Sequence, residues 1–154
     1  METDLHEKFM KEALAEARAA YDAGEVPIGC VIVKDGVVIA RAHNRTEADH
    51  NALAHAEMLA LQAAIADHGW RLPDCDMYVT LEPCSMCAGA IVHARIKNLF
   101  VAARDPKSGA CGSVLDVVGD PSLNHHPALH FGLCEEESRG LLQQFFKELR
   151  NSQK

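Results

Sequence analysis

The chain has 154 residues, of which 48% are hydrophobic and 24% charged, with 15 lysines and arginines against 22 aspartates and glutamates. This composition excludes a mostly disordered chain, and the length predicts one domain, residues 1–154, with a substantial core. The net charge of −7 argues against nucleic-acid binding through bulk positive charge. No apolar run is long enough for a membrane span, and the first residues do not resemble a secretory signal.

The six cysteines raise the question of disulfides. A chain of this length does not need such cross-links and carries no export signal, so we expect reduced thiols and a cytoplasmic protein. Cys84 and Cys87 stand apart, because Cys-x-x-Cys spacing is typical of metal or redox sites. The remaining four are expected to be small buried apolar residues: Cys30, Cys75, Cys111 and Cys134.

Helical and strand-like segments alternate along the chain. Asp4 is expected to cap a first helix that ends at Gly24, and strands 26–33 and 37–40 then form a hairpin. After an irregular polar stretch at 42–53, the pattern predicts a helix at 54–67, a strand at 77–81, a helix at 84–94, a strand at 99–102, a long loop at 104–127, a strand at 128–131 and a helix at 135–149. The sequence therefore predicts an α/β fold with three α/β/α layers around a mixed five-stranded sheet.

The residues best suited to chemistry lie in two short motifs, His55-Ala56-Glu57 and Pro83-Cys84-Ser85-Met86-Cys87. Cys84 and Cys87 are close enough in a helix for both sulfurs to reach one ion. One histidine and two thiolates make a zinc set whose fourth position is open to water, as in catalytic sites. Both motifs fall at expected helix N-termini, where the partial positive charge favours thiolates. Each residue alone has an ordinary structural explanation, but together they favour zinc.

The combination of His-x-Glu with Pro-Cys-x-x-Cys is the signature of zinc nucleobase deaminases. Over nearly its whole length the chain resembles the bacterial tRNA-specific adenosine deaminases of the cytidine-deaminase-like superfamily. The zinc motifs are common to that superfamily. The features that point to the tRNA branch are the loop at 103–110, the Asn124-His125 pair and the Phe145-Phe146 pair in the last helix.

The resemblance implies hydrolytic deamination of adenosine to inosine at the wobble position of a tRNA anticodon stem-loop. It implies one Zn²⁺ per chain, with His55, Cys84 and Cys87 as ligands, zinc-bound hydroxide as nucleophile and Glu57 as proton shuttle. It also implies a homodimer, no organic cofactor and no membrane partner. Three residues would contact the substrate: Asn44, Asp105 and Asn124.

Two other functions remain open. A deaminase of a free nucleobase or nucleoside, of the guanine or cytosine type, would share Glu57 and every zinc ligand. The loop at 103–113 and the last helix favour RNA over that substrate. A zinc-stabilised binding module without catalysis would gain nothing from an open coordination position.

Several surface residues have less specific roles. A second metal site at His125, His126 and His130 is less expected than a loop or RNA-facing role for these residues. Trp70 is expected to pack in the core or in an interface. Five basic residues are candidate phosphate contacts: Arg104, Lys107, Arg139, Lys147 and Arg150.

Overall fold

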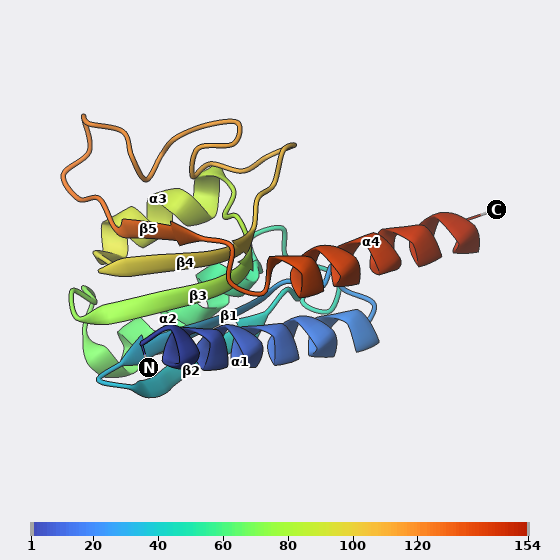
Figure 1. Ribbon diagram of the computed structural model, residues 1–154, viewed down its shortest axis with the longest axis horizontal. Coiled ribbons are helices and arrows are strands. Elements are labelled where there is room, and N and C mark those ends of the chain that lie inside the picture. The colour runs from blue at the N-terminus through green and yellow to red at the C-terminus, as the bar shows by residue number, and fades with distance from the viewer. Residues whose placement is uncertain (1, 154) are drawn as a thin grey trace.

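Five strands form one mixed sheet in the order β2-β1-β3-β4-β5 in the computed structural model, which describes residues 2–153 (Figure 1). β1 pairs antiparallel with β2 and β3, whereas β3 with β4 and β4 with β5 are parallel. The predicted three-layer α/β/α fold is confirmed. In chain order the elements are α1 (Glu2–Asp22), β1 (Gly29–Lys34), β2 (Val37–His43), α2 (Ala56–His68), β3 (Cys75–Leu81), α3 (Ser85–Ala94), β4 (Asn98–Ala103), β5 (Ala128–Phe131) and α4 (Glu135–Ser152).

The two faces of the sheet bury separate cores because successive side chains of a strand point to opposite sides. Ile32, Met77 and Leu99 are partners in neighbouring strands and pack with the buried residues of α2 and α3. The residues that alternate with them lie in the core under α1: Val31, Tyr78 and Phe100. α4 contacts β4, β3 and α1, and its C-terminal part projects beyond the sheet (Figure 1). No helix within residues 2–153 has the length and apolar character that a membrane crossing requires.

The start of β1 lies unusually close to α1. A Cβ atom built on Gly29 would lie 1.9 Å from the carbonyl oxygen of Ala13 and 2.5 Å from the backbone nitrogen of Ala17. The Gly29 amide itself donates a hydrogen bond to Oγ1 of Thr80, at 3.1 Å. Only glycine allows this approach of helix backbone to strand backbone.

Two predictions at the N-terminal end are wrong. Asp4 is not a helix cap, because α1 already includes Glu2. The first strand begins at Gly29 and not at residue 26, since Pro27 has no N–H group to donate to a sheet. Just before the strand, the amide of Ile28 bonds to the carbonyl of Val26 in a tight turn.

The second strand is longer than predicted. It extends to His43 because its pairing with β1 continues through the polar residues after Ala40. Those polar side chains have partners on α1, which the strand pattern does not reveal. His43 Nδ1 bonds to Glu16 at 2.9 Å, and Arg41 pairs with Glu12 at 3.1 Å.

The other elements begin and end within a few residues of their predicted bounds, including the long loop between β4 and β5. Of the two expectations for Trp70, packing in the core or in an interface, the first is wrong, because the residue is 69% exposed with the Arg71 guanidinium over its ring. Cys30, Cys75 and Cys111 are buried as expected, whereas Cys134 is only half-buried.

Candidate metal centre and active site

The two motifs sit at the first turns of the helices that cover one face of the sheet. His55 is the residue that caps α2, and Cys84 caps α3, as expected from the sequence. Both cap residues have extended backbone conformations and neither side chain caps its own helix. Their side chains are therefore available to each other, and Cys87 reaches the same place from the first turn of α3.

His55, Cys84 and Cys87 form a compact set of donor atoms. Nδ1 of His55 lies 3.6 Å from Sγ of Cys84 and 3.5 Å from Sγ of Cys87, and the three ligand atoms all lie within 4.8 Å of one another. A nitrogen and a sulfur bound to one tetrahedral zinc ion are separated by about 3.6 Å. The donor set therefore fits zinc in type and in spacing. Cys87 is buried, whereas His55 and Cys84 are half-buried.

The pKa values of the two thiols shift in opposite directions. The thiol of Cys87, with the amides of Cys87 and Met86, stabilises the Cys84 thiolate and lowers the pKa of Cys84 to about 5. The same hydrogen bond and burial raise the pKa of Cys87 above its ordinary range. One thiolate is thus present at neutral pH before any cation binds, and metal binding would release the second proton.

Glu57 lies in the first turn of α2 with its side chain 4% exposed. Burial raises the pKa of Glu57 to about 7, although its own amide, His55 and Cys87 oppose the shift. The group therefore gains and loses a proton near neutral pH. It is not one of the three clustered ligands, so it is available for proton transfer.

This raised pKa predicts a pH-dependent stability difference in metal-free protein. A carboxyl group whose pKa rises from 4.5 to about 7 on folding destabilises the fold increasingly between these two values. Glu57→Gln removes this effect. The unfolding free energy of the variant minus that of wild type should therefore increase by about 2–3 kcal/mol from pH 5 to pH 8. Urea unfolding at both pH values measures this gain, and a gap that does not change with pH would contradict it. The exposed carboxylate of Glu136, changed to Gln, is the control.

Asn44 lies beside the candidate active site. It is 6% exposed, and its Oδ1 accepts a hydrogen bond of 2.9 Å from the amide of Ala56, the residue between His55 and Glu57. Asn44 thereby joins the irregular segment after β2 to the start of α2.

Asp105 and Asn124 lie in the long loop after β4. The Asp105 carboxylate accepts bonds from the Lys107 amide at 3.0 Å and the Ser108 hydroxyl at 2.9 Å, which closes a turn. Asn124 is exposed. No contact described for residues 2–153 joins either residue to the three clustered donors or to the residues next to them, whereas Asn44 bonds to Ala56, the neighbour of His55.

The three histidines near the end of the long loop have other partners. Nε2 of His125 lies 2.7 Å from the carbonyl oxygen of Ile96, and Nε2 of His126 lies 2.6 Å from that of Asp120. His130 stacks on the ring of Phe100. They are not among the metal-binding groups found in the described residues.

Sequence reasoning gave no role to two buried carboxylates. Glu25 is 2% exposed and accepts bonds from the amides of Glu47 and Ala48, at 3.1 and 2.7 Å. Glu82 is 3% exposed, directly before Pro83. Burial alone would raise the pKa of Glu82, but hydrogen bonds from the Ser113 hydroxyl and three amides lower it below its ordinary value. For Glu82, the signal available in the sequence is an acidic residue at the end of an apolar strand.

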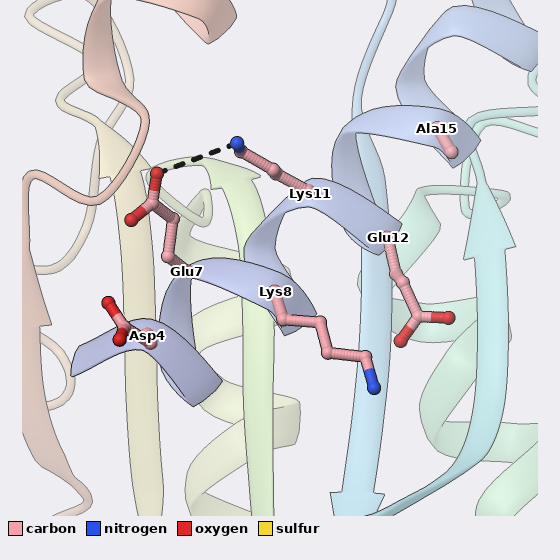
Figure 2. Close-up of a pocket in the computed structure, with 6 residues that line it drawn as sticks. All are labelled: Asp4, Glu7, Lys8, Lys11, Glu12 and Ala15. Atoms are coloured by element: carbon pink, nitrogen blue, oxygen red, sulfur yellow. Dashed lines mark ion pairs between the residues drawn. The ribbon is translucent and has the colours of Figure 1, made fainter. Parts of the chain in front are cut away.

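Two surface hollows are lined by residues other than the three clustered donors. One is lined by α1 alone and carries alternating charges, with Lys11 paired to Glu7 at 3.6 Å (Figure 2). α1 covers the opposite face of the sheet from α2 and α3. The other is an apolar groove between α2 and α3, lined by residues that include Met58, Ile65 and Trp70.

The chain matches known deaminases over most of its length. The family model of the MafB19-like deaminases matches residues 4–150. The tRNA-specific adenosine deaminase of Bacillus subtilis is 46% identical over 149 residues, which are 96% of this chain and 92% of that protein. The tRNA-specific adenosine deaminase of Agrobacterium fabrum is 50% identical over 143 residues, 92% of this chain and 94% of that protein.

Solved structures give the same result. A tRNA:A34 deaminase, studied for A-to-I editing at the wobble position of transfer RNA, superposes with a TM-score of 0.85 at 48% identity, covering 88% of this chain and 99% of that one. The guanine deaminase of Nitrosomonas europaea gives a TM-score of 0.71 at 26% identity, covering 90% of this chain and 83% of that one. The chain therefore belongs to the MafB19-like deaminases and, among them, to the tRNA-specific adenosine deaminase family.

Proposed function

We propose that this protein is a zinc-dependent hydrolase that converts adenosine to inosine at the wobble position of a tRNA anticodon. The observation that carries the proposal is the cluster of His55, Cys84 and Cys87 with the buried Glu57 in the adjacent turn. The relatives named tRNA-specific adenosine deaminases support adenosine in tRNA as the substrate. We also propose that residues 1–154 form one deaminase domain that acts in the cytoplasm.

In this mechanism His55, Cys84 and Cys87 hold one zinc ion per chain. When bound, zinc lowers the pKa of a water molecule to about 7 and so supplies hydroxide at neutral pH. Glu57 accepts the proton that the water loses and delivers it to the ring nitrogen of adenine. The hydroxide oxygen bonds to C6 of adenine. Glu57 then accepts the proton of that oxygen and passes it to the exocyclic amine, so that the C6–N bond breaks, ammonia leaves and C6 becomes a carbonyl carbon. Adenine and water thus yield hypoxanthine and ammonia without an organic cofactor.

Three residues are proposed to hold the substrate. Oδ1 of Asn44 is occupied by the amide of Ala56, so we expect its Nδ2 group to donate to the base or ribose. Asp105 would exchange its bond from the Ser108 hydroxyl for one from a ribose 2′-OH, the group that distinguishes RNA from DNA. Asn124, exposed on the same loop, would contact sugar or backbone.

Binding of the anticodon stem-loop should weaken with salt. Lys107 is exposed on the loop after β4, and each basic residue that neutralises a phosphate of single-stranded RNA contributes about −0.7 to the slope of log affinity against log salt. Lys107→Gln should reduce the slope by about that amount. Lys8→Gln, on the exposed side of α1, is the control (Figure 2). Fluorescence anisotropy at several salt concentrations measures both, and equal slopes for the variants would refute the Lys107 contact.

We further propose a homodimer that covers the apolar groove between α2 and α3. Trp70 lines this groove and is 69% exposed, which is unusual for so large an apolar side chain. Trp70→Glu should convert the dimer to monomer in sedimentation equilibrium. A wild-type protein that sediments as a monomer at micromolar concentration would contradict the dimer.

A substrate panel tests the function against its alternative. The zinc-loaded protein is incubated with an anticodon stem-loop carrying adenosine at the wobble position, and separately with free adenosine, guanine and cytosine. Mass analysis of the digested nucleosides should detect inosine from the RNA and no product from the free compounds. Conversion of free guanine or cytosine without inosine in RNA would establish the small-molecule alternative.

A further inference from the structure

We propose that Glu82 is a positioning residue whose buried carboxylate fixes the loop at 104–113 in the conformation that receives RNA. The inference deepens the proposed function and rests on it for the identity of the substrate. It assigns a task to a side chain that neither binds the metal nor transfers a proton.

The carboxylate of Glu82 is enclosed by the loop. Oε1 accepts bonds from the Asp105 amide at 3.0 Å and the Ser113 hydroxyl at 2.5 Å. Oε2 accepts bonds from the amides of Cys111 at 2.9 Å and Ser113 at 3.1 Å. A carboxylate has about four lone-pair sites, so these partners occupy it fully. Glu82 therefore has no capacity left for substrate or proton transfer.

The positions of the donor residues along the chain explain how the Glu82 side chain can order the whole loop at 104–113. Asp105 is at the beginning of the loop, and Cys111 and Ser113 are at its end, so both ends are fixed at one point. Gly109 passes so close that a Cβ atom there would lie 2.4 Å from Cδ of Glu82. The amide of Ala110 also bonds to the carbonyl of Pro83 at 2.8 Å.

Glu82 itself stands on the rigid part of the fold. It directly follows β3, and its amide donates to the carbonyl of Ala103 at the end of β4, at 2.9 Å. Two residues later, Cys84 begins the metal-binding turn. Glu82 thus ties the loop that carries Asp105 and Lys107 to the frame that holds the metal ligands.

A loop held in this way loses little conformational freedom when a ligand binds, which favours affinity. Without the carboxylate, RNA binding must order the loop, so the KM should rise while the reaction of bound RNA is little changed. Glu82→Gln is the sharpest variant, because it keeps the size of the side chain but replaces one acceptor oxygen with an NH₂ group facing N–H donors.

The test combines kinetics with hydrogen–deuterium exchange of the zinc-loaded, full-length protein. In Glu82→Gln we expect faster exchange at 104–113, one zinc per chain, a KM for the stem-loop raised about tenfold or more, and kcat within about threefold of wild type. Ser113→Ala removes only the hydroxyl bond to Oε1 and keeps the bond from the Ser113 amide to Oε2, so it should give a smaller shift in the same direction. Glu25→Gln is the matched control. It should speed exchange at 46–48 and leave exchange at 104–113 as in wild type.

The outcomes separate this inference from the proposed function. Unchanged exchange at 104–113 in both Glu82→Gln and Ser113→Ala overturns the inference, and so does a fall in kcat with an unchanged KM. Loss of zinc in Glu82→Gln, with an unaltered Ser113→Ala protein, would make Glu82 a support of the metal site and also overturn it. A wild-type protein that does not deaminate RNA refutes the proposed function, and the exchange data then still decide whether Glu82 orders the loop.

Discussion

Replacing Glu57 with glutamine is expected to reduce deamination of the stem-loop by a factor on the order of 10² to 10⁴. The glutamine amide keeps the shape of the side chain but cannot accept and return a proton. Because Glu57 is not one of the three clustered donors, zinc content should remain near one per chain. Single-turnover kinetics and elemental analysis of the same preparation measure the two quantities.

A matched carboxylate separates this role from general effects of charge. Glu136→Gln removes an exposed carboxylate from the first turn of α4 and should leave both turnover and zinc content unchanged. If Glu57→Gln lost its zinc together with its activity, Glu57 would be a structural support of the site and the proposed proton transfer would be wrong.

Gly29→Ala is expected to lower the free energy of unfolding by about 1–3 kcal/mol or more. The added methyl group would lie 1.9 Å from the carbonyl oxygen of Ala13, and α1 must move away from β1 to admit it. Such a shift also loosens the core of α1, in which Met10 and Ala13 are fully buried. Urea unfolding of the zinc-loaded protein measures the loss.

Gly140 provides the control for this substitution. It lies in α4, where a Cβ atom would have no neighbour within 4 Å. Gly140→Ala should therefore be neutral or stabilise the helix by about 0.5–1 kcal/mol. Equal stabilities of the two alanine variants would show that α1 and β1 do not need the close approach seen in the structure.

The sequence predicted the elements that form the site because their signals are local. Hydrophobic periodicity located the helices, and Pro83 marked the boundary between β3 and α3. The spacing of Cys84 and Cys87 and the position of His55 at a helix start then predicted the donor cluster. The polar end of β2 was missed because local patterns do not include the contacts with α1 that stabilise Arg41 and His43. Asp4 was mispredicted as a cap because its spacing to Glu7 matches a capping box, whereas α1 already includes Glu2.

The role of the buried carboxylates was not predictable in the same way. The partners of the Glu82 carboxylate are 23 to 31 residues away in the chain, and those of the Glu25 carboxylate are 21 to 23 residues away. Only the folded chain brings these groups together. The surface that RNA would meet is also less negative than the net charge of −7 suggests. The carboxyl groups of Glu25, Glu57 and Glu82 are counted in that charge but are buried.

The central claim is tested most directly by locating inosine in a full-length tRNA transcript. The transcript carries one adenosine at the wobble position of the anticodon and further adenosines elsewhere, and it is incubated with zinc-loaded and with chelated protein. We predict inosine at the wobble position alone with the zinc-loaded protein and none with the chelated protein. Inosine spread over other positions, or no inosine with a fully zinc-loaded protein, would contradict the account.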